Sequence, residues 1–203
     1  MKSILIIGDS FAADWSVKYS AYQGWPALLG HTYRITNLAQ AGVSEYKIYK
    51  QLLSADLTKY DYVLVSHTSP YRVATRQHPV HTNNSLHKNA DLIYSDIEYH
   101  SGRIRNWFNF ALRSAYSFFL YHYDEGFQIT TYKLYREKIN QMLEGKPVIV
   151  ISALPGLMPF ATEQTVLDYT DLRELESGLI NHFSEQGNWI IYQDLLKQLK
   201  DLK

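Results

Sequence analysis

Four short runs rich in apolar and β-branched residues divide the chain. They occupy residues 4–7, 33–38, 62–65 and 148–151, and short apolar runs bounded by turn residues are typical of buried strands. The segments between the first three runs are long enough for crossover helices, which neighbouring parallel strands require. This arrangement predicts an α/β protein with a doubly wound, flavodoxin-like parallel sheet between two helical layers, a three-layer α/β/α fold.

Helical patterns fill several of the intervals between these runs. The interval after residue 151 is short for a full helical crossover, so a strand there is predicted only weakly. We expect helices over residues 25–29, 45–53, 132–143 and 187–202, and this weaker strand over residues 165–169.

The length of 203 residues suits one domain with a substantial core, so we expect a single domain over residues 1–203. An insertion at about residues 73–130 begins polar and histidine-rich and becomes aromatic and apolar. Arg113 and His122 interrupt its apolar part, which is too short to span a bilayer. The insertion is interpreted first as core packing, and otherwise as an active-site lid or as a face through which copies form a homo-oligomer.

Charge and cysteine content exclude several classes of function. The chain has 20 basic and 20 acidic residues without a long run of either sign, which disfavours nucleic-acid and anionic membrane surfaces as partners. A small neutral or weakly charged ligand fits this balance better. The absence of cysteine excludes disulfides, thiolate metal ligands and a cysteine nucleophile. The first strand begins without a signal-peptide pattern, so the cytoplasm is the expected compartment.

The first apolar run stops at Gly8, Asp9 and Ser10. In open parallel sheets ligands bind beyond the carboxyl ends of the strands, where a serine nucleophile would be useful. An equally simple interpretation is that Asp9 or Ser10 caps the next helix. A serine nucleophile also needs a base, and among eight histidines His182 stands out because it precedes the last predicted helix, at what can be the same sheet edge.

Three short blocks resemble a known family. IIGDSFAAD at the N-terminus, LAQAGVS at 38–44 and NHFSEQGN at 181–188 resemble the first, second and fifth blocks of the SGNH (GDSL-type) hydrolases, in the same order. The resemblance implies that Ser10 is the nucleophile, His182 its general base, and the backbone N–H groups of Ser10 and Gly42 oxyanion donors. Glycine permits the close backbone approach that such a donor needs. The mechanism implied needs no cofactor and no metal.

Two positions depart from the family pattern. The third block is typically G-x-N-D, whereas this chain has Ser-His-Thr-Ser at 66–69, so Thr68 stands where the asparagine donor is expected. Its hydroxyl can also donate a hydrogen bond, over a shorter reach. The family aspartate three residues before the histidine is replaced by Leu179. A Ser-His dyad, a backbone carbonyl, or a carboxylate such as Asp171 or Glu176 remain as alternatives.

Two further groups of residues are candidates for binding a metal ion or a charged ligand. His78, His81 and His87 lie in a loop-like stretch without the helical i, i+4 spacing of a zincin, so no metal site is predicted. Arg72 and Arg76 lie close to the third-block loop, where an arginine can hold a carboxylate or phosphate of a substrate, although solvated loop arginines are the commoner case.

The sequence therefore predicts a serine esterase or acyl hydrolase acting on a small-molecule or carbohydrate ester, such as an O-acetyl or other O-acyl sugar. The first alternative is an O-acyltransferase, in which a sugar hydroxyl instead of water resolves the acyl-enzyme. The second is a non-catalytic SGNH-like binding protein that has lost the family's third-block asparagine and its aspartate.

Overall fold

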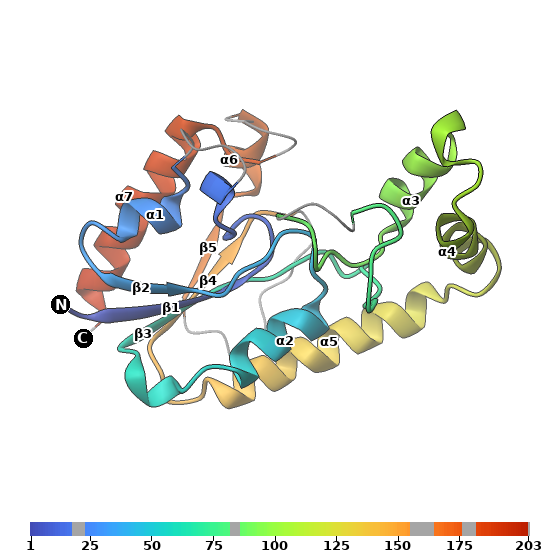
Figure 1. The fold of residues 1–203 in the computed structure, drawn as a ribbon. Coiled ribbons are helices and arrows are strands. Elements are labelled where there is room, and N and C mark those ends of the chain that lie inside the picture. Colours follow the sequence, from blue (N-terminus) through green and yellow to red (C-terminus); the bar gives the residue numbers. More distant parts are fainter. Residues whose placement is uncertain (18–22, 82–85, 155–164, 176–181, 203) are drawn as a thin grey trace.

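A five-stranded parallel sheet in the order β2-β1-β3-β4-β5 forms the centre of the protein (Figure 1). The computed structural model describes residues 1–17, 23–81, 86–154, 165–175 and 182–202. The sheet confirms the expected strands, including the weakly predicted fifth. Their bounds are Ser3–Gly8 for β1, Arg34–Asn37 for β2, Tyr62–Ser66 for β3, Val148–Ser152 for β4 and Val166–Asp168 for β5.

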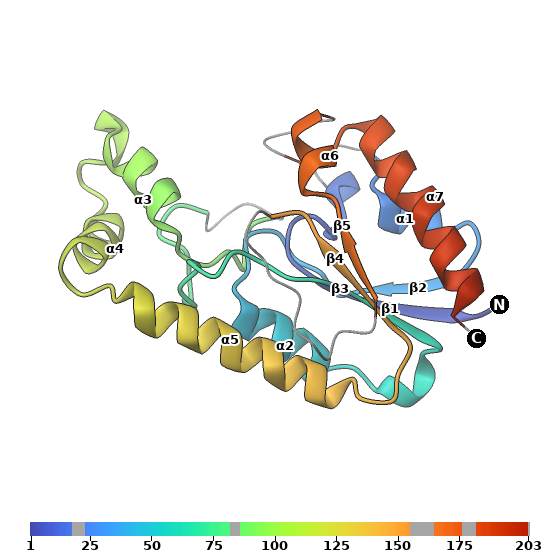
Figure 2. The same ribbon diagram turned by 180° about the vertical axis from the view of Figure 1, so that it is seen from behind.

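Helices cover both faces of the sheet, which confirms the three-layer α/β/α fold (Figures 1 and 2). The helices α1 (Trp25–Leu29) and α2 (Glu45–Leu53) have the predicted bounds. The bounds of α7 (Glu185–Asp201) differ by one or two residues from the predicted range of 187–202. The remaining helices are α3 (Tyr94–Ser101), α4 (Phe110–Tyr121), α5 (Glu125–Met142) and α6 (Thr170–Leu175), with short 3-10 helices at Trp15–Val17, Leu57–Lys59 and Ile104–Asn106.

The alternation of side chains along β1 separates two cores. Ile4 and Ile6 pack on one face with residues of α1 and α7, whereas Leu5 and Ile7 pack on the other face with residues of α2 and α5. Successive side chains of a strand point to opposite faces, so a strand buried on both faces is apolar at every position. This explains the unbroken apolar run that opens the sequence.

The predicted helix over residues 132–143 was too short, because α5 begins at Glu125. The side chain of Asp124 accepts a hydrogen bond from the Phe127 N–H and caps the new start. The first turns of α5 lie beyond the sheet, where they carry exposed side chains such as Phe127. Without a buried face they lack the apolar period on which the sequence prediction depended.

The insertion extends away from the sheet beside the start of α5 (Figures 1 and 2). Ile97, Leu112, Ala115 and Phe119 form a separate small core between α3 and α4. Core packing thus accounts for one face of α4, while Phe110 on its other face is 75% exposed. Association of copies through this region stays a prediction. Among the helices that the structure describes, none has the length and apolarity needed to cross a membrane.

The end of β1 leaves no space for a side chain at Gly8. A Cβ added there would lie 2.6 Å from the Ser66 carbonyl oxygen and 2.7 Å from the Ser66 Cβ. We expect Gly8→Ala to lower the free energy of unfolding in urea by about 3 kcal/mol, because β1 and β3 must separate. Gly145→Ala is the matched control, since Gly145 has a φ of +78° but nothing within 4 Å. It should cost only about 1 kcal/mol; equal losses would contradict the packing argument.

Candidate active site

Ser10 lies in a tight turn directly after β1, at the carboxyl edge of the sheet. The Asp9 N–H donates to the Ser66 carbonyl at 3.2 Å, and Asp9 Oδ1 accepts from the Phe11 N–H at 3.0 Å. The Ser10 carbonyl accepts from Trp15 Nε1 at 2.7 Å. The Ser10 hydroxyl makes no hydrogen bond with any described residue. Asp9 therefore fixes the turn, and the Ser10 side chain does not act as a helix cap.

His182 comes from the other end of the chain, in the segment just before α7. Ser184 caps that helix, its Oγ accepting from the Gly187 N–H at 3.0 Å. The His182 ring lies against Trp15 and Phe11, with ring centroids 4.4 Å and 4.7 Å away. His182 and Ser10 line one cavity of about 500 Å³, so the fold brings the two predicted residues to the same site. Contacts between nucleophile and base are often long before a substrate binds.

Gly42 lines the same cavity and has a left-handed φ of +77°. Its carbonyl accepts from the Asp91 N–H at 2.8 Å and from Arg72 Nη1 at 3.2 Å. A Cβ at this position would lie 2.9 Å from the Ala90 Cβ, so both conformation and space require glycine. Within the part of the chain that the structure describes, the N–H groups of Ser10 and Gly42 make no hydrogen bond.

Thr68 follows β3 and is not among the described residues that line the cavity. Its side chain is fully buried, and its N–H donates to Glu45 Oε2 at 3.4 Å. Its hydroxyl has no hydrogen-bond partner among the described residues. The next residue, Ser69, is one of those that line the cavity. The role of Thr68 as an oxyanion donor stays a prediction.

The partner of His182 also stays a prediction. Glu176 and Leu179 lie outside the described residues. Asp171 is exposed in the first turn of α6.

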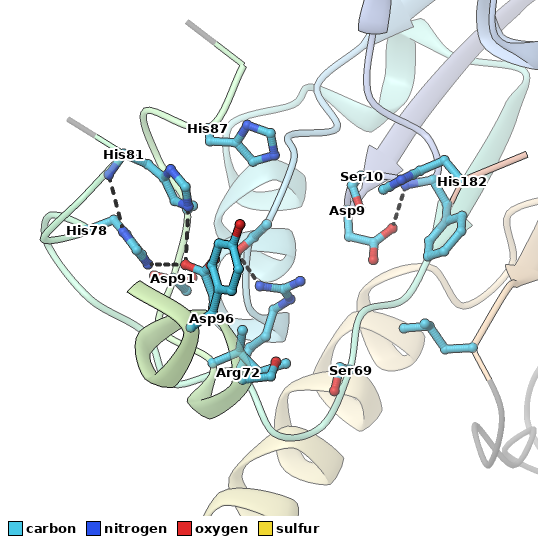
Figure 3. Close-up of a pocket in the computed structure, with 17 residues that line it drawn as sticks. Asp9, Ser10, Ser69, Arg72, His78, His81, His87, Asp91, Asp96 and His182 are labelled. Carbon is cyan, nitrogen blue, oxygen red and sulfur yellow. Dashed lines mark hydrogen bonds and ion pairs between the residues drawn. The ribbon is translucent and has the colours of Figure 1, made fainter. Parts of the chain in front are cut away.

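A cluster of histidines around Asp96 forms the opposite wall of the cavity (Figure 3). The Nε2 atoms of His78 and His81 each lie 3.1 Å from Asp96 Oδ2, and His100 Nε2 lies 3.5 Å from Oδ1. Burial acts to raise the pKa of Asp96, but His78 and His81 together hold that pKa well below its usual range. Sequence reasoning missed Asp96 and His100, although their i, i+4 spacing on α3 places both on one face.

Three residues of this cluster could in principle hold a metal ion. Ligand atoms of His78, His81 and Asp96 lie within 4.8 Å of one another, whereas His87 only lines the cavity. However, His78 Nδ1 accepts from the N–H groups of Val80 and His81, at 3.2 Å and 3.3 Å. This contact places the ring proton on Nε2, facing Asp96. A metal would have to displace that proton, so the geometry favours a cluster held by Asp96 itself.

Comparisons with known proteins return likenesses at low identity. No protein-family model and no curated protein matches the sequence. A solved structure of a G-D-S-L family protein from Desulfitobacterium hafniense, described as lipolytic, is 15% identical, with a TM-score of 0.47 over 95% of this chain and 97% of its own. The extracellular lipase of Streptomyces rimosus is 12% identical, with a TM-score of 0.38 over 95% of this chain and 70% of its own.

Burial raises the pKa of Asp9 to about 6, against the opposing effects of the Phe11 N–H and Arg72. The native state then binds more protons than the unfolded state between about pH 4 and pH 6, so this carboxyl makes the protein less stable as pH rises through that window. The asparagine side chain in Asp9→Asn does not titrate in this pH window. We expect its unfolding free energy, relative to wild type, to increase by about 2 kcal/mol between pH 4 and pH 7.

Urea titrations at several pH values measure this difference. Asp201→Asn, which alters an exposed carboxylate at the end of α7, is the matched control. If the difference in unfolding free energy between Asp9→Asn and wild type does not change with pH, Asp9 titrates in the folded protein as it does in the unfolded chain.

Proposed function

We propose that this protein is a serine esterase of the SGNH (GDSL) type. The observation that carries the proposal is the grouping, beside His182 on one cavity, of the Ser10 hydroxyl with the backbone N–H groups of Ser10 and Gly42. Neither N–H group is bonded to a described residue. Backbone donors aimed at a developing oxyanion are a main source of rate enhancement in acyl transfer. The lipolytic description of the G-D-S-L protein from Desulfitobacterium hafniense is consistent with this activity.

In the proposed mechanism, Ser10 Oγ attacks the ester carbonyl carbon while His182 takes the hydroxyl proton. The carbonyl oxygen becomes an oxyanion, which accepts from the N–H groups of Ser10 and Gly42 and from the Thr68 hydroxyl. Collapse of this intermediate breaks the bond to the alcohol, which leaves with the proton from His182. Water then attacks the acyl-enzyme, again with His182 as base, and the acid is released as the Ser10 hydroxyl re-forms.

The cavity volume of about 500 Å³ is in the range of small-molecule sites. Its wall of histidine, aspartate and serine side chains suits a polar alcohol, and we propose an O-acyl carbohydrate as the substrate class. Acceptor dependence of turnover would separate a hydrolase from an O-acyltransferase. The cytoplasm stays the expected compartment.

Ser10→Ala should abolish turnover of 4-nitrophenyl acetate and labelling by a fluorophosphonate probe, with a melting temperature close to wild type. His182→Ala should lose about as much activity, and the double variant little more, because the two residues act as one unit. Ser16→Ala changes an exposed serine of the same loop and should behave as wild type. Labelling that persists in Ser10→Ala would exclude Ser10 as the nucleophile.

Thr68→Val keeps the shape of the buried side chain and removes its hydroxyl. If that hydroxyl donates to the oxyanion, kcat should fall by about 10²-fold with little change in KM. Ser69→Ala, which removes the neighbouring hydroxyl on the cavity wall, should leave kcat nearly unchanged. A fall of kcat in Ser69→Ala but not in Thr68→Val would assign the third donor to Ser69. If kcat falls in neither variant, only the backbone N–H groups of Ser10 and Gly42 remain as proposed donors.

A further inference from the structure

Among the described residues, four charged side chains line the cavity beside the histidines: Asp9, Arg72, Asp91 and Asp96. Both carboxylate oxygens of Asp91 have partners. One of its oxygens lies 2.6 Å from Lys47 Nζ and 2.7 Å from the Thr75 N–H, while the other accepts from the Ser44 N–H at 2.7 Å. Lys47 thus balances the charge of Asp91.

The other two carboxyl groups also have partners of their own. Asp96 is held by the histidine cluster, within 3.1 Å of two imidazole nitrogens. Asp9 accepts from the Phe11 N–H at 3.0 Å and from Ser66 Oγ at 3.1 Å. Each acid on the cavity wall has these nearer partners, and none of the three forms an ion pair with Arg72.

Arg72 is the remaining charged side chain among the described residues of the cavity lining. It has no carboxylate within 4 Å among the described residues, and its Nε is buried without a hydrogen-bond partner. Within the described part of the chain, the guanidinium donates one hydrogen bond, to a neutral group, the Gly42 carbonyl. Burial pulls the pKa of Arg72 down, and the charges of Asp9, Asp91 and Asp96 offset this only in part. A desolvated guanidinium with no counter-ion is costly unless a ligand supplies one.

The backbone around Arg72 is held in place on both sides. Its N–H donates to the Ser69 carbonyl at 3.3 Å, and its carbonyl accepts from Gln128 Nε2 of α5 at 2.6 Å. The next residue, Val73, pairs with Leu92 in an isolated antiparallel bridge. Figure 3 shows the guanidinium between the histidine wall and the wall formed by Asp9, Ser10 and His182. Its position is thus set by the fold before any ligand enters.

From these contacts we infer that Arg72 is the binding residue for an oxyanion group, a carboxylate or a phosphate, on the ligand of this cavity. Guanidinium forks bind both groups through paired, charge-assisted hydrogen bonds. The placement of Arg72 against Gly42 puts such a group next to the proposed oxyanion hole. That the ligand is an ester with an anionic acyl or alcohol part rests on the proposed function; the binding of the anion itself does not.

Direct binding tests the inference without catalysis. Succinate and its neutral analogue succinamide are titrated into the full-length protein by calorimetry at low ionic strength, and inorganic phosphate separately. Succinate or phosphate should bind, and succinamide at least about tenfold more weakly than succinate, the cost of losing charge-assisted hydrogen bonds. The stronger of the two anions identifies the carboxylate or the phosphate. Failure of both anions to bind, or equal binding of succinamide, would overturn the inference.

Substitutions locate the site. Arg72→Gln should weaken anion binding by about tenfold or more, whereas Arg76→Gln should leave it unchanged, because Arg76 is exposed and outside the cavity lining. Arg72→Lys keeps the charge without the fork and should give intermediate affinity. If Arg72→Gln does not fold, the comparison of succinate with succinamide on the unsubstituted protein still tests whether the cavity binds an anion. Equal losses in the Arg72 and Arg76 variants would overturn the assignment.

Kinetics connects the anion to the proposed reaction. The 4-nitrophenyl monoester of succinic acid should have a lower KM than the neutral 4-nitrophenyl butyrate. Arg72→Gln should remove this difference in KM, whereas Arg76→Gln should keep it. If Arg72-dependent anion binding occurs but neither ester is cleaved, the proposed esterase function fails and the anion site stands. If both esters are cleaved with equal KM, the anion site fails and the esterase function stands.

Discussion

The parallel pairing of β1 with β3 is the constraint on which the candidate site depends. The register aligns Gly8 with Ser66, so the two strands end side by side at one edge of the sheet. Gln51 of α2 fixes this end from below, its Oε1 accepting from the Gly8 N–H at 2.8 Å and its Nε2 donating to the Gly8 carbonyl at 3.1 Å. With no side chain at Gly8, the chain can turn sharply, and Ser10 lies at the cavity instead of continuing the strand.

The polar groups below this edge are buried, and most are paired. His67 Nδ1 lies 2.6 Å from Glu45 Oε1, and both side chains are almost completely buried. Breaking such a pair by removing one partner leaves an uncompensated polar group in the interior. Glu45, His67 and Thr68 are buried and do not line the cavity, whereas Ser69, the next residue along the chain, does.

Sequence reasoning succeeded where local patterns carry the information. The apolar runs located the strands because β1, β3 and β4 are buried on both faces. Short blocks singled out Ser10, Gly42 and His182, which the fold brings to one cavity, and their catalytic roles stay predictions. The start of α5 was misplaced because its first turns are not buried against the sheet. Asp96 and His100 were missed because their partners come from a distant loop, and contacts of that kind have no local pattern. Arg72 and Arg76 were indistinguishable in sequence, and only the fold gives one of them a place in the cavity.

Trp15 makes two contacts that join the ends of the chain. Its indole N–H is bonded to the Ser10 carbonyl, and its ring lies against His182. Ser10 belongs to the first turn of the protein and His182 to the segment before the last helix, yet one rigid side chain touches both. A displacement of either segment must therefore be transmitted to the other through the indole ring. The two segments therefore have correlated positions. If Ser10 and His182 act as the proposed nucleophile and base, much of the entropy of aligning them is lost already when the protein folds.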